Sequence, residues 1–498
     1  MFCKIYSAVV RGITAELIEA EVDIKNGLPS FSLVGVSASE TREAKERVRV
    51  ALENTGYVLP PKRITVNLSP ADIKKEGTAF DLPVAIAVLT AFGHIPKIKV
   101  SDFLMIGELS LDGGIQAVNG VLPIVLTAKE AGIHNVLVPK QNEAEACFVE
   151  GIQIWAVSSL SETISMLKDN TKRLQNRKEK QEPLFDAKYD FANVCGQKLA
   201  KRGLEIAAAG MHNLLMSGPP GSGKSLLAKC LPSILPPLTK EESMEVSKIY
   251  SVVGKLKEKS TWITQPPFQA PHHTITQVAL AGGGKKASPG VLSLSHKGVL
   301  FLDELPEFKR ETIELLRQPL EERCIVVSRQ EATYTYPAGG IVIAAMNPCP
   351  CGYYPDRTRC SCSKEKVKRY IGKISGPIMD RMDLYVETIP PVFAELQTKK
   401  KEESSQAIRE RVLFAREQQK KRFGKFNSDM TLEELNVYCA LTGHKKEFME
   451  QAFANLQLSA RTFHRILRVA RTIADLEGST DIEEAHLAEA LCFRMTGV

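Results

Sequence analysis

A short glycine-rich stretch has the residue types needed to bind phosphate groups. It consists of Gly218, Pro219, Pro220, Gly221, Ser222, Gly223, Lys224 and Ser225. Glycines at this spacing let backbone N–H groups turn toward phosphate oxygens, and the helix expected after them adds the positive end of its dipole. Lys224 supplies a positive charge for the β- and γ-phosphates, and the Ser225 hydroxyl is a Mg²⁺ ligand. The whole stretch is therefore predicted to bind ATP with Mg²⁺.

Two carboxylates follow an apolar run further along the chain. Residues 299–302 read VLFL, which is typical of a buried parallel strand, and Asp303 and Glu304 come directly after them. Parallel sheets bind ligands at the carboxyl ends of their strands. Asp303 is suited to hold Mg²⁺, directly or through water, and Glu304 to orient or deprotonate an attacking water. Many strands end in acids, but downstream of a phosphate-binding loop this pair predicts ATP hydrolysis.

A third apolar run, residues 340–346, ends at Asn347. An amide at the tip of a neighbouring strand can contact a γ-phosphate and position the attacking water. Taken alone, Asn347 is more typical of a turn before Pro348. The residues by themselves leave both interpretations open.

Four of the 11 cysteines lie close together, in the pattern C-x-C-x8-C-x-C: Cys349, Cys351, Cys360 and Cys362. Such a loop is short enough to close on one tetrahedral Zn²⁺. The spacing differs from the commoner C-x2-C pairs, and two close pairs are also compatible with cysteines in turns. Disulfides are the poorer alternative in a reducing cytosol. Since the loop runs from Asn347 toward Arg381, a metal here would brace that path rather than perform chemistry.

Bringing these motifs together requires a parallel sheet. From about residue 190 to 390 the chain alternates strand, glycine loop, helix, long insert, strand, helix and strand, which is typical of an α/β domain. Helical periodicity follows, in residues 405–423, 447–456, 460–478 and 482–493. The N-terminal part instead mixes predicted strands with predicted helices, the clearest being strands 64–70 and 135–139 and helices 38–56 and 121–132.

The composition is that of a globular protein with two or three domains in 498 residues. A net charge of +7 permits nucleic-acid binding without requiring it. No stretch reaches the roughly 18 apolar residues of a membrane span, and residues 82–95 suit a buried helix. The N-terminus reads as strands rather than a signal peptide, and the remaining cysteines are scattered. We therefore expect a cytoplasmic protein with no membrane partner.

The order of the phosphate loop, acidic strand end and Asn-ended strand is that of the AAA+ ATPases. The chain resembles their magnesium-chelatase-like branch, which includes ComM and YifB, in FQAPHHTIT, PGVLSLSHKGVLFLDELPEF, LLRQPLEE, AAMNPCPCG, KISGPIMDRMDLYVE and SARTFHRILRVARTIADL. The resemblance implies a P-loop AAA+ core over residues 191–390, with a helix-2 insert and a pre-sensor hairpin. It also implies a helical lid over residues 391–498 and assembly into a homo-hexamer.

The same resemblance assigns roles to single residues. Asn347 becomes the sensor-1 residue, Arg381 in MDRMD the arginine finger that reaches a neighbouring subunit's nucleotide, and Arg461 in SARTF the sensor-2 arginine. Without the resemblance, both arginines would be interpreted as surface charges. An arginine finger is worth about 10³–10⁵ in rate where it acts.

Residues 67–89 and 107–142 resemble the proteolytic domain of Lon, which implies a ribosomal protein S5 domain 2-like α+β fold over residues 1–168. Where that family has a catalytic Ser and Lys, this chain has Ala79 and Leu122. Ala has no nucleophilic oxygen and Leu cannot act as a base, so we predict a domain without protease activity. A polar, mostly basic linker over residues 169–190 is expected to join it to the AAA+ core.

Two segments are candidates for contact with DNA. The insert carries a glycine-rich tip ending in Lys285 and Lys286, and the hairpin offers Arg329, Tyr334 and Tyr336. A plain glycine linker and ordinary hairpin aromatics explain these residues equally well. The resemblance implies an ATP-driven DNA helicase that promotes branch migration when transforming DNA recombines. The alternative is a chelatase-like motor that remodels a protein partner.

Overall fold

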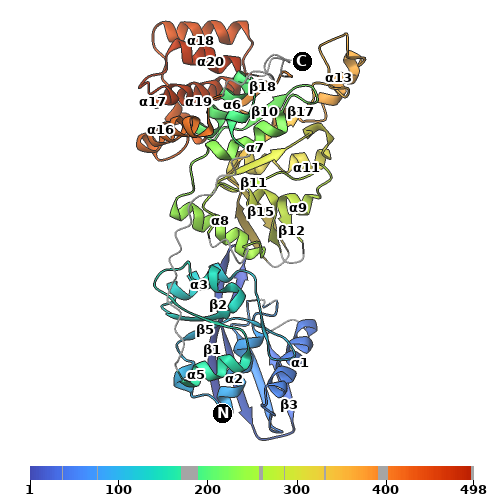
Figure 1. Cartoon of the computed structure of the whole chain (residues 1–498), viewed down its shortest axis with the longest axis vertical. Coiled ribbons are helices and arrows are strands. Elements are labelled where there is room, and N and C mark those ends of the chain that lie inside the picture. Colours follow the sequence, from blue (N-terminus) through green and yellow to red (C-terminus); the bar gives the residue numbers. More distant parts are fainter. Residues whose placement is uncertain are drawn as a thin grey trace. The chain divides into compact units, whose positions relative to one another are not determined.

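The structure, a computed structural model, describes residues 1–35, 38–73, 75, 77–169, 189–256, 262–284, 287–329, 332–390 and 402–494, with backbone alone for residues 38–42. Two compact units make up the chain (Figure 1). The first comprises Met1–Gln181 with Ser243–Ile263, and the second Glu182–Glu242 with Thr264–Val498. Most of the predicted linker, as well as Lys285 and Lys286 of the glycine-rich tip, lies outside the described residues.

A seven-stranded sheet with the order β3-β4-β2-β1-β5-β8-β9 forms the centre of the first unit. Its strands are β1 (Phe2–Arg11), β2 (Thr14–Lys25), β3 (Ser30–Val34), β4 (Arg63–Ser69), β5 (Phe103–Met105), β8 (Asn135–Pro139) and β9 (Gln153–Val157), and β6 (Glu108–Leu109) pairs with β7 (Ile115–Gln116) outside it. The helices are α1 (Ala38–Asn54), α2 (Asp81–Ala91), α3 (Val121–Glu130), α4 (Glu143–Ala146), α5 (Leu160–Asp169) and the part of α8 (Lys240–Val252) from Ser243 onward. The strands and helices predicted for this region are confirmed.

Helices cover both faces of this sheet because side chains alternate along its strands. In β1, Ile5 and Val9 enter one apolar cluster, which includes α1 and α2, whereas Ala8 enters a second cluster, which includes α3. Helix α2 is buried along its whole length, as predicted for the apolar stretch that contains it.

The segment Ser243–Ile263 folds with the first unit although it lies far along the chain. The Ser251 hydroxyl donates a hydrogen bond to Glu145. The backbone N–H of Leu122 donates to Glu145 Oε1 at 3.0 Å, and that of Gly120 to the carbonyl oxygen of Ser251 at 3.0 Å. Burial raises the pKa of the Glu145 carboxyl. The chain thus returns to complete the first unit after the phosphate-binding loop.

The second unit contains a five-stranded parallel sheet with the order β11-β14-β17-β10-β18. Its strands are β11 (Phe268–Gln269), β14 (Val299–Leu302), β17 (Ile341–Met346), β10 (Leu214–Ser217) and β18 (Leu384–Glu387). Every residue of β10, β14 and β17 is buried, which explains their continuous apolar sequences. The predicted parallel α/β core is confirmed.

The helices around this sheet are α6 (Lys198–Gly210), α7 (Lys224–Ile234), α9 (Gln277–Ala281), α10 (Val291–Leu294), α11 (Arg310–Glu314), α12 (Arg317–Glu322), α13 (Lys364–Ile371) and α14 (Gly376–Met379). The C-terminal helices are α16 (Ser405–Phe423), α17 (Leu432–Tyr438), α18 (His444–Asn455), α19 (Ala460–Leu476) and α20 (Glu484–Cys492). Figure 1 shows this last group gathered beside α6.

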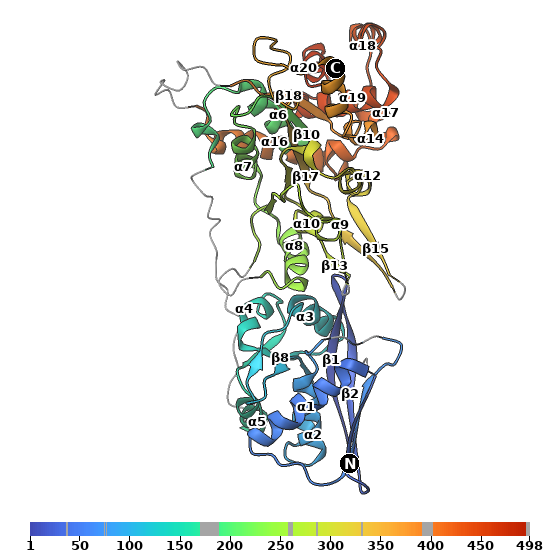
Figure 2. The ribbon, with the colours of Figure 1, turned by 90° about the vertical axis from the view of Figure 1, so that its right-hand side faces the viewer.

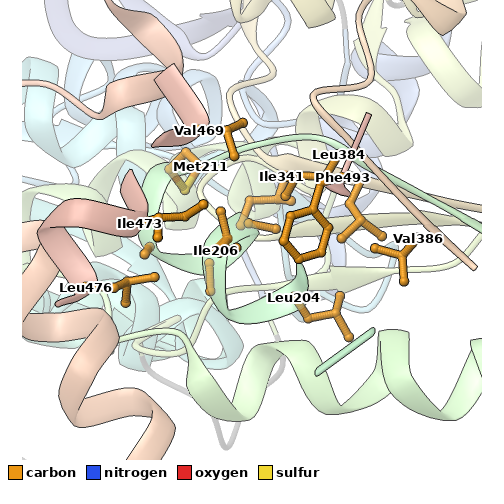
Figure 3. Close-up of a cluster of buried hydrophobic side chains, with 14 of the residues drawn as sticks. Leu204, Ile206, Met211, Ile341, Leu384, Val386, Val469, Ile473, Leu476 and Phe493 are labelled. Atoms are coloured by element: carbon orange, nitrogen blue, oxygen red, sulfur yellow. The ribbon is translucent and has the colours of Figure 1, made fainter. Parts of the chain in front are cut away.

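The C-terminal helices and the parallel sheet share one apolar core (Figure 3). Leu204 and Ile206 of α6 lie in it with Ile341 of β17 and Ile473 of α19, and all four are buried. The helical region predicted beyond residue 391 is therefore packed against the sheet through α6.

Candidate nucleotide-binding site

The carboxyl ends of three parallel strands bring the predicted site residues together. Lys224 Nζ donates to Asn347 Oδ1 at 3.3 Å and to the carbonyl oxygen of Gly218 at 2.7 Å. Ser225 Oγ donates to Asp303 Oδ2 at 2.6 Å. The lysine and serine of the phosphate-binding loop thus lie beside the polar residues that follow β14 and β17.

The backbone of the loop requires glycine at several points. Gly221 and Gly223 have φ angles of 78° and 86°, in the left-handed region that favours glycine. A Cβ on Gly218 would lie 2.1 Å from Thr388 Oγ1, so no larger residue fits there. Since α7 begins at Lys224, its first N–H groups lie at this loop and can bind an anion. The phosphate-binding loop and the start of α7 therefore fit the phosphates of a nucleoside triphosphate.

Lys224 is mostly buried, with 9 % of its surface exposed. Burial lowers the pKa of its ammonium group, while Asp303 and Glu304 act in the opposite direction. A desolvated cation beside two acids suits a site where phosphate and Mg²⁺ neutralise one another. Asp303 and Ser225 offer the oxygen ligands that Mg²⁺ prefers.

Glu304 adopts an uncommon backbone conformation. Its φ is 53°, and its N–H donates to Asp303 Oδ1 at 3.0 Å. Left-handed backbone at a residue other than glycine costs about 1–3 kcal/mol and is concentrated at functional sites. The side chain is 57 % exposed, and its Oε2 lies 3.9 Å from His273 Nδ1. The carboxylate is therefore open to solvent, where it can reach a water molecule.

Sequence reasoning missed two residues that fix the loop from behind. The Thr388 hydroxyl lies 2.8 Å from the Ser222 hydroxyl, and the Thr388 N–H donates to the Ser217 carbonyl oxygen at 2.8 Å. Gln197 Nε2 donates to the Ser222 carbonyl oxygen at 3.0 Å. Thr388 follows β18 as Asn347 follows β17, so a polar residue after a fourth apolar run was the available signal.

Comparison with protein families agrees with this geometry. Residues 190–396 match the family described as magnesium chelatase, subunit ChlI, and residues 402–494 match its C-terminal part. Residues 20–142 match a further family, subunit ChlI of Mg-chelatase.

Individual relatives extend over nearly the whole chain. Competence protein ComM of Haemophilus influenzae is 42 % identical over 495 residues, covering 98 % of this chain and 97 % of that protein. The chain belongs to the ComM/YifB family of magnesium-chelatase-like AAA+ proteins. YifB of Salmonella typhimurium is 40 % identical over 491 residues, covering 98 % of this chain and 96 % of YifB.

An archaeal Lon protease of Methanocaldococcus jannaschii is 27 % identical over 148 residues, covering 30 % of this chain and 22 % of that protease.

The two arginines that the ComM/YifB resemblance singles out meet at one acid rather than at Lys224. Arg381 and Arg461 both donate to Glu321 Oε1, Arg461 at 2.9 Å. Arg381 also donates to the Pro377 carbonyl oxygen at 2.6 Å, and its buried Nε has no hydrogen-bond partner among the described residues. Glu321, at the end of α12, was not predicted.

The hairpin and the insert of this ComM/YifB-family chain lie against each other. Strands β15 (Cys324–Ser328) and β16 (Thr333–Pro337) pair antiparallel, as predicted, and Figure 2 shows them extending from the second unit. The insert contains β12 (Gly282–Gly283) and β13 (Ser288–Pro289), and the Tyr336 hydroxyl donates to the Ala287 carbonyl oxygen. Tyr336 is 1 % exposed, and burial raises its pKa to about 12. The Tyr336 ring is therefore covered by this packing and is not free to stack on a base, whereas Arg329 is exposed.

The two positions that correspond to the Lon dyad lie in an apolar environment. Leu122 is fully buried in an apolar cluster at the start of α3, and Ala79 packs against that cluster.

Within the part of the chain that the structure describes, no helix has the length and apolar character to cross a membrane.

Proposed function

We propose that this chain is an ATP-hydrolysing AAA+ motor that moves DNA, promoting branch migration during recombination of transforming DNA. The observation that carries the ATPase part is the pair of contacts Lys224–Asn347 and Ser225–Asp303 at the carboxyl ends of parallel strands. The DNA part is supported by the full-length similarity to a protein named for competence, ComM.

Each residue of the site takes one role in this proposal. Lys224 and the N–H groups of residues 218–225 bind the phosphates, and Ser225 and Asp303 hold Mg²⁺. Glu304 activates the attacking water, and Asn347 orients it against the γ-phosphate. The cofactors are ATP and Mg²⁺, with a structural Zn²⁺ at the four cysteines.

Assembly into a homo-hexamer completes the site. Arg381 acts as the arginine finger on the nucleotide of the neighbouring subunit, and its unpartnered Nε leaves a donor for that contact. Arg461 contacts the nucleotide of its own subunit from the helical lid. The division into residues 1–168, a linker over 169–190, a core over 191–390 and a lid over 391–498 belongs to the same proposal.

The N-terminal domain is proposed to be a platform without protease activity. Ala79 and Leu122 cannot form the catalytic Ser–Lys pair of Lon. Leu122 lies in an apolar cluster and Ala79 packs against it. The motor is placed in the cytoplasm, where its scattered thiols stay reduced.

A second candidate is a chelatase-like motor that remodels a protein partner. It is favoured by the family match over residues 190–396, whose description names a magnesium chelatase subunit. The two candidates share the ATP site and differ in what stimulates it.

The deciding experiment measures ATP hydrolysis with and without single-stranded, duplex and branched DNA. We expect branched DNA to stimulate the wild-type rate and Lys224→Ala to abolish hydrolysis. Lys229→Ala is the matched control, since Lys229 lies on the same helix and is exposed. Hydrolysis without DNA stimulation, together with no DNA binding at low salt, would reject the DNA motor in favour of the second candidate.

Arg329→Ala tests the hairpin as the DNA contact. We expect weaker DNA binding with a salt dependence reduced by about one unit of slope, because one phosphate contact is lost. Lys446→Ala removes a similarly exposed cation from the C-terminal helices. It should leave the DNA affinity and its salt dependence unchanged.

A further inference from the structure

The loop Pro348–Ser363, which joins β17 to α13, carries the four cysteines and forms neither helix nor strand. The buried cluster around it consists of the thiols of Cys349, Cys360 and Cys362 with Val367 of α13, and Cys351, Tyr354 and Ile371 pack against it. Irregular loops of this length are uncommon inside compact domains, and so few apolar groups cannot fix one. Another source of stability is needed.

The sulfur atoms have the spacing of ligands around one metal ion. Cys349 Sγ lies 3.3 Å from Cys351 Sγ and 3.7 Å from Cys360 Sγ. Cys351 Sγ and Cys360 Sγ are 3.5 Å apart. The four sulfurs, including that of Cys362, lie within 4.8 Å of one another. Tetrahedral Zn²⁺ with Zn–S bonds of about 2.3 Å places its sulfurs about 3.8 Å apart. A disulfide would require about 2.05 Å.

Groups around the cysteines suit a metal bound by thiolates. The Tyr354 N–H points at Cys349 Sγ, 3.4 Å away. Arg357 donates to the Cys362 carbonyl oxygen at 2.7 Å and lies 4.9 Å from the centre of the Tyr354 ring. Zn²⁺ with four thiolates is net negative, so a nearby guanidinium and an N–H donor stabilise it.

The same loop rests on the phosphate-binding loop. Gly352 is buried with a φ of 87°, and a Cβ there would lie 2.5 Å from Pro220 Cδ. Where the cysteine loop begins, the Met346 carbonyl oxygen accepts a hydrogen bond from the Gly218 N–H at 3.2 Å. The middle of the cysteine loop thus contacts the phosphate-binding loop, and β17, which leads into the cysteine loop, is hydrogen-bonded to it.

We propose that Cys349, Cys351, Cys360 and Cys362 bind one structural Zn²⁺, and that the zinc-closed loop supports the phosphate-binding loop through Gly352 and Pro220. The second part rests on the proposed ATP site. With zinc removed, the cysteine loop has no other closure of comparable strength and Pro220 loses its support. Nucleotide affinity then falls although Lys224 is intact.

The first experiment measures metal in the full-length protein purified without added zinc. We expect one zinc per chain by mass spectrometry of the metal, and close to none in Cys360→Ser. Cys492→Ser, an exposed thiol on α20, is the control and should keep its zinc. A wild-type zinc content near zero, with no uptake of added Zn²⁺ or Co²⁺ by the reduced protein, would overturn the metal site.

The second experiment separates the support of the phosphate-binding loop from zinc binding. Gly352→Ala should retain its zinc yet bind a fluorescent ADP analogue about tenfold more weakly, equivalent to about 1.4 kcal/mol. Gly424→Ala is matched, because Gly424 has a φ of 74° but no atom within 4 Å of its would-be Cβ. It controls for backbone strain alone.

Removal of zinc from the wild-type protein by a mercurial and a chelator should weaken ADP binding, and added Zn²⁺ should restore it. Unchanged ADP affinity after zinc removal and in Gly352→Ala would overturn the support while leaving the metal site standing. If zinc-loaded wild-type protein fails to bind ADP at all, the proposed ATP site itself is wrong.

Discussion

Glu321 accepts hydrogen bonds from two arginines whose assigned roles are to act on nucleotides. Its contact with Arg461 is a surface pair, the two side chains being 48 % and 51 % exposed. Such pairs are worth less than about 1 kcal/mol. Arg381 is the more buried of the two, with 11 % of its side chain exposed. Under the proposed roles, the phosphates of a bound nucleotide compete with Glu321 for both arginines.

Glu321→Gln should therefore raise the ATPase rate, by up to about fivefold for 1 kcal/mol. Gln keeps an acceptor oxygen but lacks the charge, so it should hold Arg381 and Arg461 less tightly than Glu321 does. Arg381→Ala should instead lower the rate by about 10³-fold. Steady-state ATP hydrolysis of both variants checks this, and a Glu321→Gln protein as inactive as Arg381→Ala would show that the acid holds the finger in its working position.

Thr388 supports the phosphate-binding loop through its hydroxyl. Thr388→Val keeps the shape but removes the hydrogen bond to Ser222, which is worth about 1 kcal/mol, so ADP should bind about fivefold more weakly. Titration with a fluorescent ADP analogue measures the change. Thr388→Ser retains the hydroxyl and should bind like the wild type; equal loss in both variants would argue against the hydrogen bond.

Motif residues were predictable and their supports were not. Lys224, Asp303 and Asn347 stand at fixed points of strand–loop patterns, so their convergence follows from a parallel sheet. Gln197 contacts the phosphate-binding loop, and Glu321 contacts Arg381 and Arg461, only because distant segments pack together. The burial of Tyr336 was not predictable either, because alternation along a hairpin does not tell which of its two faces is covered.

Among the elements, α19 carries a buried ionic network that ties the C-terminal helices together. Asp475 accepts from Arg471 Nε at 3.1 Å, Arg422 Nη1 at 3.0 Å and Asn427 Nδ2 at 2.9 Å. Arg471 and Asp475 are each 1 % exposed. Removing one partner of a buried pair leaves the other charge uncompensated.

Asp475→Ala should destabilise the second unit by about 3–5 kcal/mol. Urea denaturation followed by circular dichroism measures this. Glu450→Ala, which removes an exposed acid near Lys446, should change stability by less than about 0.5 kcal/mol. Both tryptophans, Trp155 and Trp262, belong to the first unit, so their emission follows that unit, while circular dichroism follows both. A loss for Asp475→Ala no larger than for Glu450→Ala would contradict the network.

Most elements were predictable because apolar periodicity sets them locally. The helices α16 and α19 begin at the residues where their patterns begin, each capped by the preceding serine. The placement of α8 was not predictable, because Ser251 and Glu145 are far apart in sequence and only tertiary contacts join them.

At the scale of the assembled molecule, a finger acting in trans makes a specific prediction. Lys224→Ala and Arg381→Ala are each expected to be inactive. Mixed in equal amounts, they should form rings in which about a quarter of interfaces pair an intact Lys224 site with an intact Arg381. Recovery of about that fraction of wild-type hydrolysis is the expected result. No recovery from mixtures shown by light scattering to form rings would place the finger on its own subunit's nucleotide.

The interleaving of the two units along the chain has a consequence for gene fragments and for evolution. A fragment that stops at residue 181 lacks Ser243–Ile263 and leaves the buried Glu145 without Ser251. A fragment that starts at residue 182 still carries Ser243–Ile263, a segment that belongs to the first unit. The two units are therefore inherited together: no single crossover can exchange one of them intact for a foreign counterpart.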